Sequence, residues 1–104
     1  MKIQINTDKT INGSEKLNDT LTSLLTDELN RFSEQITRLE VHLTDEDGNK
    51  DGKNDKRCML EARMEGIPPI AVINHAETCE NAVKGAAEKL KSSIISNIGR
   101  LKSH

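Results

Sequence analysis

Residues 79–102 decide the fold, and they read CENAVKGAAEKLKSSIISNIGRLK. Apolar side chains recur through this stretch at intervals of three and four residues: Cys79, Ala82, Val83, Ala86, Leu90, Ile94, Ile98 and Leu101. That spacing predicts one amphipathic helix with a single apolar stripe, and Thr78 is its expected N-cap. At about 1.5 Å per residue the helix is about 36 Å long, which is the width of a small domain.

The opposite face of this predicted helix carries mainly positive charge. Glu80 and Glu88 are its acidic residues. Five basic residues outnumber them: Lys84, Lys89, Lys91, Arg100 and Lys102. They form a first cluster over 84–91 and a second over 100–102, with the neutral residues 92–99 between them. Solvated lysines are common on amphipathic helices, so the pattern alone does not require a ligand.

Negative charge gathers in residues 45–55, where five carboxylates and two lysines give a net charge of −3. Residues 84–104 have a net charge of +4, so the total of −2 does not argue against a nucleic-acid partner.

Residues 47–52, DGNKDG, match the first half of a calcium-binding loop, with Asp55 at a further ligand position. The twelfth position holds Cys58 in place of a glutamate, so a hairpin loop without a metal is the preferred interpretation.

Length and composition suit a single domain over 1–104 with an aliphatic core. Phe32 is the only aromatic residue, so the chain lacks a platform on which bases could stack. Cys58 and Cys79 lie in apolar patterns and are expected to be free thiols. No apolar run is long enough to span a membrane or to act as a signal peptide, so we expect a cytoplasmic location and no membrane partner.

Periodicity predicts the remaining elements. They are a strand over 2–6, a helix with its apolar stripe over 17–32, and strands over 36–44, 56–65 and 70–74. The first helix is expected to begin at Ser14 and Glu15, or at a capping box of Asn12 and Glu15. The residues Gly-Ile-Pro-Pro over 66–69 predict a turn before the last strand.

The resulting order, β-α-β-β-β-α, predicts an α+β fold. Short connections favour antiparallel pairing of the three later strands, and a four-stranded sheet with both helices on one face buries all the apolar stripes together. The opposite sheet face is then polar and carries Gln4, Arg38, Glu40, His42, Arg57, Glu61 and Arg63. Because these charges nearly balance, a solvated face with cross-strand ion pairs is the simplest interpretation.

Residues suited to catalysis are scattered along the chain. The histidines are His42, His75 and His104, and the sequence has no Ser/His/Asp order, HExxH motif or glycine-rich phosphate loop. We therefore expect no enzyme activity, no catalytic residue, no cofactor and no small-molecule substrate.

Short motifs follow one another along the whole chain. They are Ile3–Ile5, Ser14–Leu17, Phe32–His42, Leu60–Arg63, Ala82–Leu90 and Arg100–His104. In this order and at this spacing, they resemble the short ribosome hibernation-promoting factor and ribosome-associated inhibitor family. Residues 41–46 and 55–59 are similar to a divergent branch of that family, described only as ribosome-associated.

The resemblance implies a fold similar to double-stranded-RNA-binding domains, without the C-terminal dimerisation domain of longer members. It implies a translation regulator that binds the small ribosomal subunit in the mRNA and tRNA channel and inactivates or protects ribosomes under stress or in stationary phase. Ribosomal RNA would contact the final helix at Lys84, Lys89, Lys91, Arg100 and Lys102, and the strand over 56–65 at Lys56, Arg57 and Arg63. The first cluster, over 84–91, is expected to make a fixed contact with the RNA, and the second cluster, over 100–102, an adaptable contact. The acidic residues 45–55 are a candidate contact for a basic ribosomal protein.

A second class of function stays open, a protein-interaction or regulatory module of the same fold with weakened RNA binding. The acidic residues 45–55 and the neutral residues 92–99 motivate it. RNA binding itself suits the composition, because an A-form surface is recognised through phosphates and shape and needs no aromatic platform. Sedimentation with ribosomes at low salt distinguishes the two hypotheses.

Overall fold

The computed structural model describes residues 1–11, 13–46 and 55–102, with side chains described up to Gly99. In chain order the elements are β1 (Lys2–Thr7), α1 (Glu15–Glu28), the 3-10 turn η1 (Asn30–Phe32), β2 (Ile36–Asp45), β3 (Lys56–Met64), β4 (Ile67–Ala76) and α2 (Cys79–Lys102). The predicted order β-α-β-β-β-α is confirmed, with η1 as an added short turn after the first helix.

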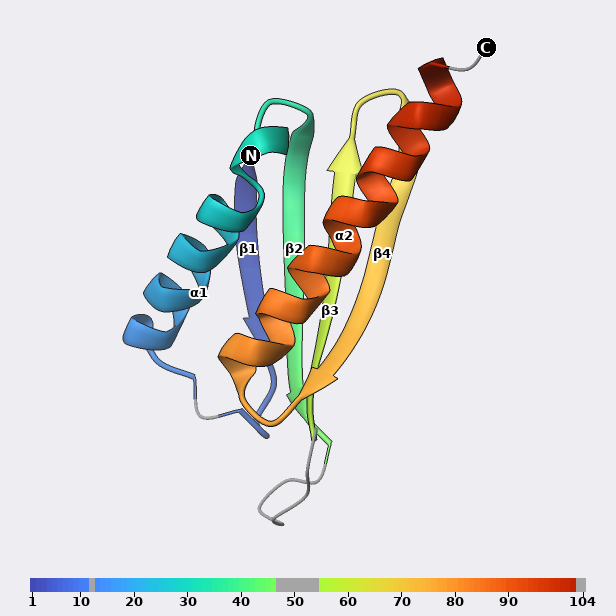
Figure 1. The fold of residues 1–104 in the computed structure, drawn as a ribbon. Helices are drawn as coiled ribbons and strands as arrows, with labels where there is room; N and C mark the ends of the chain where they lie inside the picture. The colour runs from blue at the N-terminus through green and yellow to red at the C-terminus, as the bar shows by residue number, and fades with distance from the viewer. Residues whose placement is uncertain (12, 47–54, 103–104) are drawn as a thin grey trace.

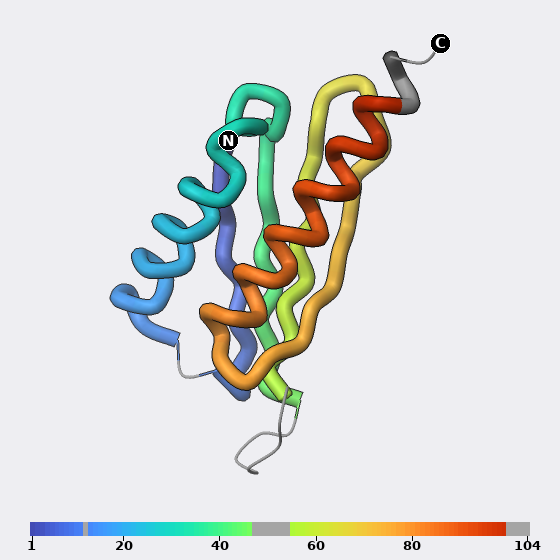
Figure 2. Tube along the Cα trace, in the orientation of Figure 1, coloured from blue at the N-terminus to red at the C-terminus, as the bar shows by residue number. Residues whose placement is uncertain are grey.

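The four strands form one sheet in the order β1-β2-β3-β4. β1 is parallel to β2 because α1 carries the chain back between them, whereas β3 pairs antiparallel with both β2 and β4. Both helices lie on the same face of the sheet, as predicted (Figure 1). Figure 2 shows α2 running obliquely along β3 and β4, from the end of β4 towards the β3–β4 turn.

The core between the helices and the sheet is aliphatic, as the composition predicts. The largest fully buried side chains are Leu21, Leu25, Leu29, Ile36, Leu39, Val41, Leu43, Cys58, Leu60, Val83, Leu90 and Ile94. Ala82 and Ala86 are also fully buried, and such small side chains allow the backbone of α2 to approach the sheet closely. A Cβ atom on Gly85 would lie 2.2 Å from Asn74 Nδ2, the amide that donates a hydrogen bond to the Ala82 carbonyl at 3.2 Å. The apolar stripe of α2 and this close contact therefore fix how the helix sits on the sheet.

Both helices begin at the predicted caps. The Ser14 hydroxyl accepts a hydrogen bond from the Leu17 N–H at 3.0 Å, so the Ser14 start is confirmed. Asn12, the alternative start, lies outside the described residues. The Thr78 hydroxyl accepts a hydrogen bond from the Asn81 N–H at 3.1 Å, which confirms it as the N-cap of α2.

The prediction of a turn over 66–69 followed by a strand over 70–74 was wrong at its boundaries. The turn consists of Glu65 and Gly66, whose φ of 85° favours glycine, and β4 already begins at Ile67. Pro68 and Pro69 therefore lie within the strand. β4 is an edge strand, where a missing N–H is tolerated, and its register against β3 shifts at this point.

Candidate nucleic-acid interface

The three lysines of the first basic cluster have different surroundings on α2. Lys84 is exposed to solvent. The Lys89 ammonium donates a hydrogen bond to the backbone carbonyl of Ile73 on β4 at 2.8 Å. The Lys91 ammonium forms an ion pair with Glu28 Oε2 of α1, also at 2.8 Å. The cluster that looks uniform in sequence is therefore partly bound to other groups of the same chain.

Glu28 lies at the end of α1 and brings a carboxylate to the lysines of α2. The hydrogen bond from Lys91 lowers the pKa of Glu28, and the charges of Lys91 and Lys84 act in the same direction against the effect of partial burial. The side chains of Lys91 and Glu28 are 33% and 25% exposed, so solvent and solutes reach this ion pair.

Lys89 completes the edge of the sheet. An edge strand leaves part of its backbone carbonyls without a strand partner, and β4 is such a strand. By donating to the Ile73 carbonyl, Lys89 satisfies one of these groups and places a charge where another strand would otherwise pair.

The second basic cluster lies on the last turn of α2, which extends through Lys102 as predicted. The side chains of Arg100 and Lys102 lie outside the described part of the structure.

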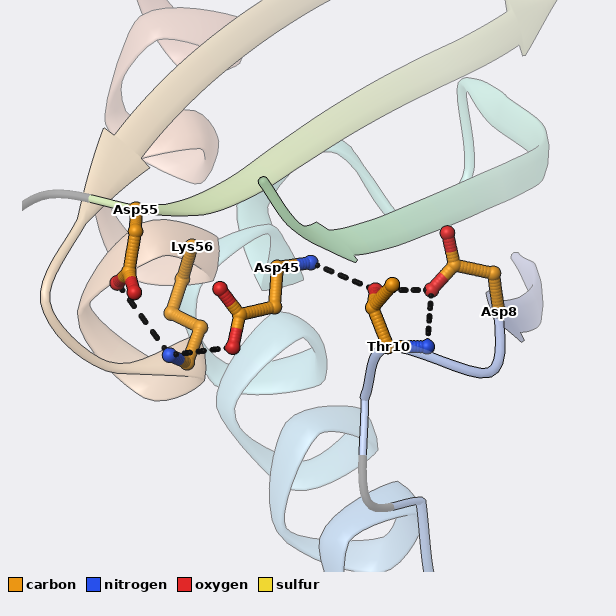
Figure 3. A network of polar contacts seen from close by, with 5 residues as sticks. All are labelled: Asp8, Thr10, Asp45, Asp55 and Lys56. Atoms are coloured by element: carbon orange, nitrogen blue, oxygen red, sulfur yellow. Dashed lines mark hydrogen bonds and ion pairs between the residues drawn. The ribbon is translucent and has the colours of Figure 1, made fainter. Parts of the chain in front are cut away.

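Lys56 holds two buried aspartates together at the end of the sheet opposite the β3–β4 turn (Figure 3). Its ammonium lies 3.0 Å from Asp45 Oδ2 and 3.3 Å from Asp55 Oδ1, and we call these three residues the Lys56 clamp. Asp45 and Asp55 are only 7% and 6% exposed. The hydrogen bond to Asp45 is the main reason why the pKa of Lys56 is raised. The clamp joins the end of β2 to the start of β3.

A hydrogen-bonded turn supports the Lys56 clamp from the side of β1 (Figure 3). The Asp45 N–H donates to the Thr10 hydroxyl at 2.9 Å, and the Thr10 N–H donates to Asp8 Oδ1 at 2.9 Å. The Thr10 hydroxyl also bonds to Asp8, and these bonds lower the pKa of that carboxyl. The acidic residues 45 and 55 thus have a structural role that the sequence did not indicate, while the calcium-like residues 47–52 lie outside the described residues.

Arg57 and Arg63 lie on the open face of the sheet, as their alternation with the buried residues of β3 shows. Arg63 lies 3.5 Å from Glu61 and, across the strands, 3.9 Å from Glu40. His42 lies 3.9 Å from the same Glu40. The interpretation of this face as one with cross-strand ion pairs is confirmed for the Arg63–Glu40 pair.

The strand register adds two basic residues that were not proposed as contacts from the sequence. Lys2 on β1 pairs with Arg38 on β2, and Arg38 pairs with Arg63 on β3, so three cations form a row across the open face. The Arg38 guanidinium donates a hydrogen bond to the Gln4 side chain, and its Nε is buried without a hydrogen-bond partner among the described residues. The row depends on the parallel register of β1 with β2 and on the antiparallel register of β2 with β3, and no spacing in the sequence encodes either register.

The two cysteines are free thiols, as predicted. Burial raises the pKa of Cys58 to about 12 and also raises the pKa of Cys79. A thiol with a raised pKa is poorly ionised at neutral pH and is a poor nucleophile.

The described residues, 1–11, 13–46 and 55–102, were also compared with the requirements of a metal site, a membrane-spanning helix and a ligand pocket. Within these ranges no group of three His, Cys, Asp or Glu side chains is placed to hold a metal, and no helix is long and apolar enough to cross a membrane. A hollow of about 330 Å³ lies between α2 and the β3–β4 turn. Its described lining has two carboxylates and no cation, which does not suit an anionic ligand: Glu34, Gln35, Thr37, Met64, Glu65, Ile67 and Ile98.

Comparisons with known proteins found one family model and similar folds that cover nearly all of the chain. The model of the family described as Sigma 54 modulation protein / S30EA ribosomal protein matches residues 3–102. The fold is similar to the N-terminal domain of Protein Y from Thermus thermophilus, with a TM-score of 0.69 and 16% identity over 90% of this chain and 96% of that one. It is also similar to a ribosomal subunit interface protein from Coxiella burnetii, with a TM-score of 0.71 and 17% identity over 95% and 99% of the two chains. No protein with a curated function matches the sequence.

Proposed function

Because the chain belongs to the Sigma 54 modulation protein / S30EA ribosomal protein family, we propose that it is a ribosome-associated translation regulator. In this proposal it binds ribosomal RNA of the small subunit in the mRNA and tRNA channel and inactivates or protects ribosomes under stress or in stationary phase. It acts by occupying space, without chemistry of its own, and it acts in the cytoplasm, where ribosomes work. The family match over 3–102 is the observation that carries the proposal.

The surface of α2 supports an RNA partner in physical terms. A rigid helix with lysines on its solvent side can follow a phosphate path, and recognition of A-form RNA through phosphates and 2′-hydroxyls needs no aromatic residues. The resemblance to the fold of Protein Y is consistent with this use of the scaffold, although that fold by itself does not specify a ligand.

The proposed contacts differ in how readily they reach a phosphate. Lys84 is exposed and is the leading contact of the first cluster. Lys89 and Lys91 first have to leave the Ile73 carbonyl and Glu28, respectively. The proposed set is completed by the second cluster, Arg100 and Lys102, and by the secondary contacts Lys56, Arg57 and Arg63.

A protein-interaction module with weakened RNA binding is the second candidate function. The observation that favours it is the engagement of Lys56, Lys89 and Lys91 with groups of the same chain, which leaves fewer cations for RNA. On this hypothesis the chain binds a ribosomal or regulatory protein, and its binding does not depend on the charge of Lys84.

Co-sedimentation with purified small ribosomal subunits at low salt tests the proposed function. The wild type is expected to sediment with the subunit, and Lys84→Glu is expected to weaken binding strongly. Lys16→Glu is the matched control, because Lys16 is an exposed lysine at the start of α1. A wild type that stays in the supernatant would rule out the RNA-binding proposal, and equal binding of the wild type and both variants would favour the protein-interaction module.

A further inference from the structure

We infer that Glu28 is an internal anion that occupies the phosphate site formed by Lys84 and Lys91, and that it sets the affinity of α2 for nucleic acid. The inference rests on the proposed function, and it adds an affinity-determining residue on α1 that carries no positive charge. The ligand class is a phosphodiester, whose anionic oxygens accept the same charge-assisted hydrogen bonds as a carboxylate.

The geometry places the carboxylate where a ligand would bind. Lys84 and Lys91 are seven residues apart, which is close to two helical turns, so they lie on the same side of α2. Glu28 Oε2 lies 2.8 Å from the Lys91 ammonium, and Lys84 is near enough to help lower the pKa of Glu28. Glu28 thus contacts Lys91 directly and lies within electrostatic range of Lys84.

The position of Glu28 within α1 is unfavourable for the helix itself. It is the last residue of α1, and the last turn has no basic residue. A negative charge at a helix C-terminus faces the negative end of the helix dipole, so α1 gains nothing from a glutamate there. The stabilising partner of Glu28 is Lys91 on α2, which indicates that the contact between the helices is the reason for the charge.

The ion pair is exchangeable. The two side chains remain 33% and 25% exposed, so a phosphate can approach Lys91 from solvent and displace the carboxylate. Binding then replaces one anion by another at Lys91, while Glu28 loses its partner and repels the incoming phosphate. Glu28 therefore weakens nucleic-acid binding through competition and through repulsion.

Glu28→Gln tests this inference because it removes the charge and keeps the size and the hydrogen-bonding oxygen. We expect it to bind small ribosomal subunits about fivefold more tightly at low salt, the upper end of the strength of an exposed ion pair. The log–log salt dependence should steepen by about 0.9, because one more lysine releases counterions on binding. Asp27→Asn is the matched control: Asp27 is the exposed neighbour on α1, and the substitution changes the net charge equally.

A gain in Glu28→Gln that Asp27→Asn does not share supports the inference, and equal affinities of the two variants overturn it. Lys91→Met in the Glu28→Gln background should abolish the gain, whereas a gain that persists without Lys91 would also overturn the inference. Thermal unfolding verifies that each variant is folded.

A second measurement keeps the inference separate from the proposed function. On a heparin column, which presents a simple polyanion, Glu28→Gln should elute at higher salt than Asp27→Asn. If no variant binds the small subunit, the proposed function fails, and the column still decides the inference: later elution of Glu28→Gln supports it, and co-elution with Asp27→Asn refutes it.

Discussion

The Lys56 clamp and the Lys91–Glu28 pair are both contacts between lysine and carboxylate, but they lie in different environments. Lys56 bridges two aspartates whose side chains are 8% and 5% exposed, and a hydrogen-bonded turn supports one of them. Lys91 contacts one carboxylate that is 25% exposed. Burying a charge is costly unless its partners are in place, so the clamp contributes to stability and holds Lys56 more firmly than Glu28 holds Lys91. The pair between α1 and α2 is accessible, and Lys91 is available for exchange with a ligand.

Lys56→Met should have the largest effect, and the effect should be on stability. The substitution leaves Asp45 and Asp55 buried without a counter-charge, so Tm should fall by several degrees. Thermal unfolding followed by circular dichroism measures this, with Lys9→Met, at an exposed position, as the control. A Tm equal to that of the control would show that the clamp has no structural role.

Lys84→Glu should have the next largest effect, and it should be confined to binding. Reversing the charge of an exposed lysine removes one phosphate contact and adds repulsion, so affinity for the small subunit should fall about tenfold at low salt. Tm should stay within a degree or two of the wild type, since surface substitutions have small effects on stability. An unchanged dissociation constant would remove Lys84 from the interface.

The sequence predicted the fold well because the fold depends on periodic patterns. The stripe of α2 and the alternation in β2 and β3 are repeated many times, so each boundary is supported by several residues. The beginning of β4 was not predicted, because the tolerance of Pro68 and Pro69 depends on the strand lying at the edge of the sheet.

The interface was predicted less completely than the fold. Lys89 and Lys91 lie on the helix as expected, but their partners, the Ile73 carbonyl and Glu28, are 16 and 63 residues away in the chain. Such contacts follow from how the layers pack, and a reading of α2 alone counts these lysines as free. The family resemblance, confirmed by the match over 3–102, does not indicate these contacts either.

Lys91→Met should have a smaller effect than Lys84→Glu on binding and a small effect on stability. It removes a lysine that already has an internal partner, so affinity should fall by only about two- to threefold. Loss of the partly exposed ion pair should reduce the free energy of unfolding by about 0.5 kcal/mol. Denaturant unfolding and subunit binding, measured on the same preparation, check both values; a loss of affinity equal to that of Lys84→Glu would contradict exchange at Lys91.

The smallest effect concerns pH. The pKa of Glu28 is lowered in the folded protein from its ordinary value of 4.5, so the ion pair stabilises the fold above that pH and the contribution is lost as the pH falls through the folded-state pKa. The difference in the free energy of unfolding between the wild type and Glu28→Gln should therefore be present at pH 7 and vanish in acid. Urea unfolding at pH 7 and at an acidic pH below the folded-state pKa of Glu28 measures this difference in the free energy of unfolding. A difference that is the same at both pH values would contradict the contribution of the ion pair.

The salt dependence of small-subunit binding tests the central claim most directly, namely that α2 binds phosphates through its basic residues. If Lys84, Lys89, Arg100 and Lys102 release counterions, the log of the association constant should fall with the log of salt concentration with a slope of about −4. Glu28→Gln should steepen the slope by about 0.9, as Lys91 joins them. An association constant that stays the same between low and moderate salt would contradict the claim.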